Sequence, residues 1–244
     1  MARQVRVFVA ELAAGRRELP REQAHYLGVV HRLGVGAPFV AFDPELGLEA
    51  EGSVVRSERG RVECELSEPR AAHKRSLGVT LLQGASKGDR LEQVVRAGTA
   101  LGVERVLVVA CERSVTQPSD LRRERLRSIA LEAARQSGRG DLPRLDGPDA
   151  LPEALDRARS EPGLKLYLSP SSEAPFSERI TAWRAGDPVQ LLVGPEGGLS
   201  EVELELAEAA GFRDASLGPF VLRTELAAIA ALSCFVGRLA ATIG

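Results

Sequence analysis

Two loops rich in glycine and proline carry the acidic and basic side chains best placed for chemistry. The first, GPEGG at residues 194–198, directly follows an apolar segment and holds Glu196. The second, residues 217–225, contains another Gly-Pro pair together with Arg223 and Glu225. Adjacent glycines let backbone amides approach a ligand closely. A carboxylate or cation beside that ligand can move a proton or stabilise developing charge, so these loops predict a ligand-binding and catalytic site.

Several common cofactor and metal signatures are absent from the sequence. Neither GxGxxG nor GxxxxGK[ST] occurs, which disfavours dinucleotide and P-loop chemistry. The three His residues are too few, and Cys64, Cys111 and Cys234 too widely spaced, for an ordinary structural zinc site or a disulfide framework. We therefore expect no metal and a reducing, cytoplasmic setting.

From residue 77 onward, short apolar segments alternate with segments of helical periodicity, which is typical of a parallel α/β sheet. Ser200 followed by Glu203 is a capping-box signal, and Gly102 is a suitable helix stop. Ligands bind at the carboxyl ends of strands in such sheets. The expected strands are residues 77–83, 106–110, 164–168, 189–193 and 215–217, and the expected helices are 89–101, 119–137, one opening at 200, and 224–239.

The first 70 residues have a different pattern, rich in short strands and turns. Val5, Val7 and Val9 alternate with other residues, the period of a half-buried strand. Further short strands, and a helix within residues 20–33, predict a small barrel or sandwich. The polar segment 69–75 marks the expected boundary, which gives a β domain at 1–70 and an α/β domain at 71–244.

Composition limits the classes of protein that this chain can be. It has 244 residues, of which 44% are hydrophobic, enough to bury a core. No apolar run is long enough for a membrane-spanning helix, and we expect no signal peptide. The net charge of −2 excludes a uniformly basic coat, although residues 113–144 carry a local excess of arginine.

The loop motifs, taken together, resemble those of one family. GPEGGLS at 194–200, LG at 217–218 and LRTE at 222–225 resemble the ribosomal small-subunit uridine-N3 methyltransferase family, often called RsmE, of the SPOUT class. Similar matches run along nearly the whole chain. They include His25 with VHR at 30–32, KGDR at 87–90, LGV at 101–103, ERS at 112–114 and EAARQSGR at 132–139.

The resemblance implies a PUA-like, RNA-binding β-barrel followed by a SPOUT domain with a parallel sheet and a deep trefoil knot. It also implies S-adenosyl-L-methionine as cofactor and N3 of a uridine in 16S ribosomal RNA as methyl acceptor. The partners would be ribosomal RNA or the small subunit, and a second copy in a homodimer. The cofactor-binding residues it implies are Leu168, Ser169, Gly194, Pro195, Glu196, Gly197, Leu217, Gly218, Leu222 and Thr224.

Methylation at uridine N3 requires loss of the N3 proton, which a carboxylate base or a cation near O2 or O4 would assist. Glu225 and Glu196 are the candidate carboxylates, and Arg223 is the candidate cation. For Glu225 the alternative is helix capping alone, and for Arg223 it is an ion pair with Glu225 or a neighbour. The sulfonium donor is already activated, so no metal is required.

RNA contacts are expected outside the cofactor loops. The candidates are His25, Arg32, Lys87, Arg113 and Arg139. The alternative for Arg139 is a solvated surface arginine, and for His25 it is packing. Helix 224–239 is apolar on more than one stripe, which predicts a homodimer interface there, and we expect Cys234 on this helix to be core.

Departures from the family pattern keep other functions open. Phe220 stands where the family usually has Arg, Leu226 where it has Thr, and Ala97 and Ala100 replace a Lys and a Glu. One alternative is an RNA methyltransferase of the same fold with a different RNA target. Another is a non-catalytic RNA-binding factor in ribosome assembly. A dinucleotide-dependent oxidoreductase is disfavoured by the missing fingerprint.

Overall fold

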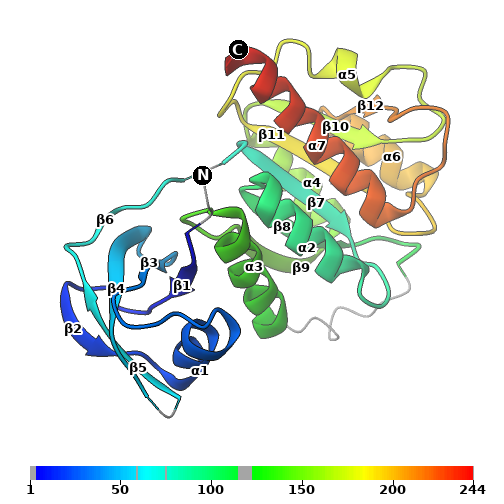
Figure 1. Cartoon of the computed structure of the whole chain (residues 1–244). Helices are drawn as coiled ribbons and strands as arrows, with labels where there is room; N and C mark the ends of the chain where they lie inside the picture. Colours follow the sequence, from blue (N-terminus) through cyan, green and yellow to red (C-terminus); the bar gives the residue numbers. More distant parts are fainter. Residues whose placement is uncertain (1–3, 59, 75, 115–122, 244) are drawn as a thin grey trace. The chain divides into compact units, whose positions relative to one another are not determined.

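A computed structural model describes residues 4–58, 60–74, 76–114 and 123–243 (Figure 1). The chain divides into two compact units. Unit 1 comprises Met1–Arg75 and Leu131–Leu142, and unit 2 comprises Ser76–Ala130 and Pro143–Gly244. Each unit has a hydrophobic core of its own.

Unit 2 is built on a six-stranded sheet in the order β12-β10-β11-β7-β8-β9, in which every paired neighbour is parallel. Its strands are β7 (Val79–Gly84), β8 (Arg105–Ala110), β9 (Arg144–Ala150), β10 (Leu164–Leu168), β11 (Val189–Val193) and β12 (Arg213–Ala215). The helices that begin in unit 2 are α2 (Arg90–Leu101), α3 (Arg123–Ser137), α4 (Leu151–Ser160), α5 (Phe176–Arg179), α6 (Glu201–Ala209) and α7 (Thr224–Ile243). The prediction of a parallel α/β sheet is therefore confirmed.

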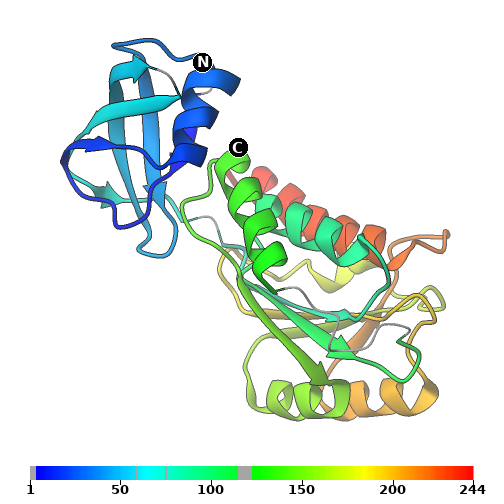
Figure 2. The ribbon, with the colours of Figure 1, turned by 90° about the horizontal axis from the view of Figure 1, so that it is seen from below.

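Helices cover both faces of this sheet, and Figure 2 shows α2 and α7 on one face with α4 and α6 on the other. The central strands are consequently apolar at consecutive positions. Leu81 pairs with Leu191 and faces the core under α2 and α7, whereas Leu82 pairs with Leu192 and faces the core under α4 and α6. Because the strands run in one direction, their carboxyl ends share one edge.

Local signals place the ends of two helices as expected. Gly102 adopts a left-handed φ of 93° directly after α2, a conformation that glycine reaches without strain. At the start of α6, Ser200 Oγ accepts a hydrogen bond from the backbone amide of Glu203 at 3.3 Å, and the Glu203 carboxylate accepts one from the Ser200 amide at 2.9 Å. The predicted capping box is therefore confirmed.

Some elements differ from the sequence prediction. Strand β12 ends at Ala215, so the strand expected at 215–217 lies mostly in the following loop. Strand β9 was not expected, because its sequence RLDGPDA has no apolar alternation. The strand is held in the sheet by pairing with β8. Helix α4 was not expected either, although its buried residues recur at helical spacing: Leu151, Ala154, Leu155 and Ala158.

Unit 1 contains a second six-stranded sheet, ordered β1-β3-β4-β5-β2, with β6 also paired to β4. Among the described residues the outer strands β1 and β2 do not pair, so the sheet is not a closed barrel. Helix α1 (Arg21–His25) continues into the π-helix η1 (Tyr26–Val30), in the segment where a short helix was expected. The strands are β1 (Arg6–Phe8), β2 (Gly15–Glu18), β3 (Pro38–Asp43), β4 (Leu48–Glu58), β5 (Arg61–Leu66) and β6 (Arg70–Ala71).

The end of α3 belongs to unit 1 and packs within it. The Arg135 guanidinium lies 3.7 Å from the centre of the Tyr26 ring, a cation–π contact. The backbone amide of Gly140 donates to the carbonyl of His73 at 3.1 Å.

None of the helices in the described residues is both long and apolar enough to cross a membrane.

Candidate functional site

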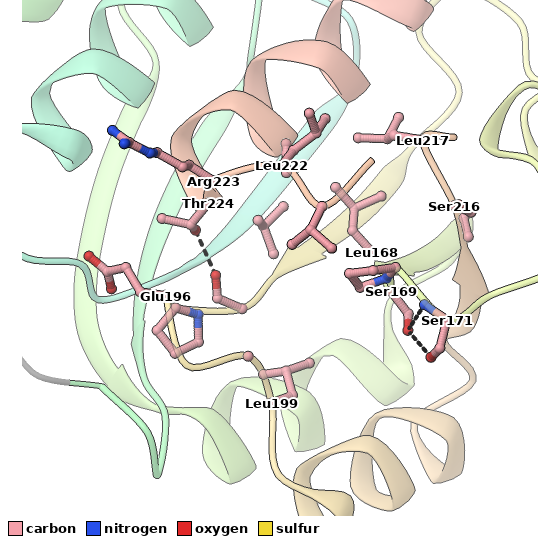
Figure 3. A pocket seen from close by; sticks show the side chains of 18 of the residues that line it. Leu168, Ser169, Ser171, Glu196, Leu199, Ser216, Leu217, Leu222, Arg223 and Thr224 are labelled. Atoms are coloured by element: carbon pink, nitrogen blue, oxygen red, sulfur yellow. Dashed lines mark hydrogen bonds between the residues drawn. The ribbon is translucent and has the colours of Figure 1, made fainter. Parts of the chain in front are cut away.

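A pocket of about 600 Å³ lies at the carboxyl edge of the unit 2 sheet, where the loops after β10, β11 and β12 converge (Figure 3). This is where an open parallel sheet binds ligands, and the volume suits a small molecule. Most of the predicted cofactor-binding residues line it. They are Leu168, Ser169, Gly194, Pro195, Glu196, Leu217, Gly218, Leu222 and Thr224.

Gly197 is the exception, because it does not line the pocket. A Cβ atom at Gly197 would lie 3.0 Å from Cβ of Arg113. The Arg113 guanidinium donates hydrogen bonds to the carbonyls of Gly197 at 3.2 Å and Leu199 at 3.4 Å. In this structure Arg113 therefore holds the loop at Gly197. The cofactor contact expected of Gly197 and the RNA contact expected of Arg113 stay predictions.

A chain of hydrogen bonds joins the loop after β11 to the start of α7. The Thr224 hydroxyl, on the first residue of α7, donates to the carbonyl of Gly194 at 2.6 Å (Figure 3). Nε2 of Gln83, near the end of β7, donates to the same hydroxyl oxygen at 2.8 Å. The start of α7 is thereby tied to the ends of two central strands.

Glu196 is held at the pocket by Lys87, in the loop after β7, and by Arg90, the first residue of α2. Its Oε1 accepts a hydrogen bond from the backbone amide of Lys87 at 3.1 Å, and it forms an ion pair with Arg90. Burial alone would raise the pKa of Glu196, but hydrogen bonds from its own amide and from Lys87, with the Arg90 guanidinium, outweigh burial and lower the pKa. An acid in this state is a weak base, which favours a structural or electrostatic role. Lys87 itself is exposed.

Glu225 lies in the first turn of α7 and is almost fully buried. Its Oε2 accepts no hydrogen bond within the described residues, and Nε of Arg90 lies 3.6 Å from it. Arg90 therefore bridges Glu196 and Glu225, and it lines the pocket as well. Arg90 was not among the residues predicted from the sequence, although it is the last residue of the KGDR motif at 87–90.

Arg223 lines the pocket, and its residue is exposed. Within the described part of the chain no carboxylate lies within ion-pair distance of it, so the pair with Glu225 that the sequence allowed is not formed. Figure 3 shows the Arg223 side chain directed away from Ser169 and Leu217. A cation in this position remains available to a substrate.

The predicted RNA-binding residues of unit 1 separate into two groups. His25 and Arg32 are exposed, and Arg32 has a left-handed φ of 52°. Arg139 is only 1% exposed, and its guanidinium forms two hydrogen bonds with the Asp141 carboxylate, at 3.0 and 2.9 Å. The prediction that Arg139 contacts RNA phosphate is therefore wrong for this structure, because a phosphate cannot reach the side chain. The alternative that Arg139 is a solvated surface arginine is also wrong, because its side chain is buried.

Several residues on and before α7 are more exposed than a core helix requires. Phe220 lines the pocket and is 78% exposed, and Leu226 is 50% exposed. Cys234 is also exposed, so the prediction that it lies in the core is wrong.

Among the described residues, no group of His, Cys, Asp and Glu side chains is arranged to hold a metal ion.

Comparisons with known proteins agree on one family. The RNA methyltransferase domain family matches residues 73–236. The ribosomal RNA small subunit methyltransferase E of Bacillus subtilis is 31% identical over 222 residues, which cover 87% of this chain and 86% of the relative. That of Synechocystis is 30% identical and covers 88% of this chain and 71% of the relative.

Solved structures show the same similarity along the chain. A ribosomal RNA small subunit methyltransferase E from Neisseria gonorrhoeae, bound to S-adenosyl methionine, has a TM-score of 0.82 and 28% identity, over 97% of this chain and 98% of that one. A methyltransferase from Legionella pneumophila, in complex with the same cofactor, has a TM-score of 0.81 and 30% identity, over the same shares. This chain belongs to the ribosomal RNA small subunit methyltransferase E family.

Proposed function

We propose that this protein is an enzyme that transfers a methyl group from S-adenosyl-L-methionine to N3 of a uridine in 16S ribosomal RNA. The observation that carries the proposal is the pocket at the carboxyl edge of the unit 2 sheet, lined by the loops that resemble the family's cofactor loops. The relatives named above are small-subunit rRNA methyltransferases, and two of the similar structures contain the cofactor.

The residues of the pocket fit this cofactor. Leu168, Leu199, Leu217 and Leu222 provide apolar walls for an adenine ring, and loop hydroxyls and backbone groups are available for polar contacts. Bound S-adenosylmethionine supplies an electrophilic methyl group on a sulfonium. The protein's contribution is orientation of the reacting atoms, which is worth several kcal/mol.

Within this proposal, Arg223 is the residue that faces the target base. Its guanidinium has no carboxylate partner among the described residues, and it is suited to stabilise negative charge on O2 or O4 as the N3 proton leaves. Glu225 is the stronger candidate for the base, because the pKa of Glu196 is lowered by its partners. Glu225 does not line the pocket in this structure. We therefore propose that Glu225 removes the N3 proton only after RNA has bound.

The base must be unpaired or turned out of a helix before N3 can reach the pocket. We propose that unit 1, corresponding to the expected domain 1–70, is a PUA-like domain that holds this RNA through His25 and Arg32. Both residues are exposed, and the Arg32 cation suits a phosphate. We assign Lys87 the same role at the edge of the pocket.

We further propose a homodimer with α7 at its interface, a trefoil knot in the α/β domain of residues 71–244, and a cytoplasmic location. The exposed Leu226 on α7 supports the interface. The family relationship supports the knot. Free thiols at Cys64, Cys111 and Cys234 are compatible with a reducing compartment.

The proposal can be tested by incubating the protein with small-subunit rRNA, or with small subunits, and cofactor labelled in its methyl group. We expect label in RNA, and nucleoside analysis should identify it as 3-methyluridine. Label in another nucleoside would favour a different RNA target. RNA binding without any transfer would favour the assembly-factor alternative.

A further inference from the structure

A buried amide stands at the end of a strand that is otherwise largely apolar. Gln83 of β7 is fully buried, and it follows Leu81 and Leu82. Its Nε2 donates to the Thr224 hydroxyl oxygen at 2.8 Å and to the Gly84 carbonyl at 3.3 Å. Its Oε1 accepts no hydrogen bond within the described residues. Burying a polar atom without a partner costs stability, so this residue calls for a reason other than packing.

The geometry of Thr224 provides that reason. A hydroxyl has one proton to donate, and the Gln83 amide occupies the acceptor side of the Thr224 oxygen. The hydroxyl proton is therefore directed to its other neighbour, the Gly194 carbonyl, at 2.6 Å. Gln83 thus fixes the direction of a hydrogen bond that holds the first residue of the GPEGG loop.

The backbone beside Gln83 supports the same loop by close packing. A Cβ atom added at Gly84 would lie 2.4 Å from the backbone nitrogen of Pro195 and 2.7 Å from the carbonyl carbon of Gly194. Real Cβ atoms do not approach backbone this closely, so only glycine fits here. The end of β7 therefore supports the Gly194–Pro195 peptide through both Gln83 and Gly84.

We propose that Gln83 is a positioning residue for the methyl-donor pocket, acting through Thr224 on the Gly194 carbonyl. Gln83 does not line the pocket, whereas Thr224, Gly194 and Pro195 do. This inference rests on the proposed function, because it takes S-adenosylmethionine as the ligand. It assigns Gln83 to the shape of the cofactor site rather than to the stability of the sheet.

The test separates these two roles with Gln83→Leu, which removes the amide but keeps most of the volume. We expect an unchanged or higher melting temperature, since a buried oxygen without a partner is removed. We expect the Kd for S-adenosylmethionine, measured by calorimetry, to rise roughly 5- to 10-fold, the size of one hydrogen bond. The KM for RNA should stay the same.

A matched control exists in the neighbouring strand. Gln190 of β11 is also a buried amide, and its Nε2 donates to Glu161 at 2.8 Å. It does not line the pocket and does not contact Thr224. Gln190→Leu should leave the Kd for the cofactor unchanged. An equal loss of affinity in this control would overturn the inference.

A double-mutant cycle tests the path through Thr224. Thr224→Val should weaken cofactor binding, Thr224→Ser should restore it, and adding Gln83→Leu to Thr224→Val should cause little further loss. Multiplicative losses, or unchanged affinity in folded Gln83→Leu, would overturn the proposal. Gln83→Met replaces Gln83→Leu if the latter does not fold, and failure of both to fold would show a structural role instead. A wild-type protein that binds no S-adenosylmethionine would instead refute the proposed function.

Discussion

The two units of this protein present charged residues in different ways. In unit 2, Arg90, Glu196 and Arg223 lie around one pocket, at the edge where parallel strands end. In unit 1, several arginines pair with acids of the sheet surface, as Arg16 does with Glu63 at 2.7 Å, and Arg139 is buried with Asp141.

The difference follows from sheet topology. Parallel strands deliver all their carboxyl ends to one edge, so loops distant in sequence converge there. In unit 1 most neighbouring strands are antiparallel, and their loops are shared between opposite edges. We therefore assign the chemistry to unit 2 and a broader contact with RNA to unit 1.

The largest effect is expected for Arg223→Ala. Loss of a cation that stabilises charge only in the transition state should lower kcat about 100- to 1,000-fold. The Kd for RNA should change little, and Arg223→Lys should recover part of the rate. Arg213→Ala, an exposed arginine of β12 outside the pocket lining, is the control. A normal kcat in folded Arg223→Ala would remove Arg223 from the chemistry.

The next largest effect, on the Kd for S-adenosylmethionine, is expected for Gly84→Ala. The added Cβ collides with the backbone of Pro195, so the pocket loop must shift, and overpacking of this kind costs about 1–3 kcal/mol. The Kd for S-adenosylmethionine should rise about 5- to 150-fold, as measured by calorimetry. Gly34→Ala in unit 1 meets no atom within 4 Å and should bind normally. Equal affinities for the two variants would contradict the account of the loop.

A moderate effect on RNA binding alone is expected for Arg32→Ala. Loss of one phosphate contact should weaken RNA affinity and reduce the slope of log K against log salt by about one. The rate at saturating RNA should persist, in contrast to Arg223→Ala. Arg56→Ala, whose guanidinium already pairs with Glu58 at 2.9 Å, serves as the control. An unchanged salt slope in Arg32→Ala would place the RNA elsewhere.

The smallest effect concerns the stability of the fold against pH. The pKa of Glu196 is lowered from an ordinary value of 4.5, so the carboxylate stabilises the folded chain above pH 4.5, and this contribution is lost as pH falls through the lowered pKa. The free energy of unfolding of Glu196→Gln should be below that of wild type at pH 6, and the two should converge on acidification. A difference that is constant with pH would show that the ionised pair with Arg90 does not stabilise the fold.

Sequence patterns were most informative where topology determined position. Apolar strands followed by glycine and proline predicted the loops that converge, and nine of the implied cofactor residues line the pocket. The patterns could not show that Arg113 binds its neighbouring loop, that Arg139 is buried, or that Arg90 bridges two acids. These properties depend on side chains from distant segments. Strand β2, of sequence GRRE, was missed because its pairing with β5, and not its own composition, makes it a strand.

Amide hydrogen exchange tests the central claim, the division between a cofactor pocket in unit 2 and an RNA contact in unit 1, most directly. Exchange slows where a ligand orders or covers the backbone. We predict that S-adenosylmethionine slows exchange in residues 168–172, 194–199 and 216–224 and leaves residues 20–35 unchanged, and that an rRNA fragment slows exchange in residues 20–35. Cofactor protection in residues 20–35, or its absence from the three pocket loops, would contradict the account.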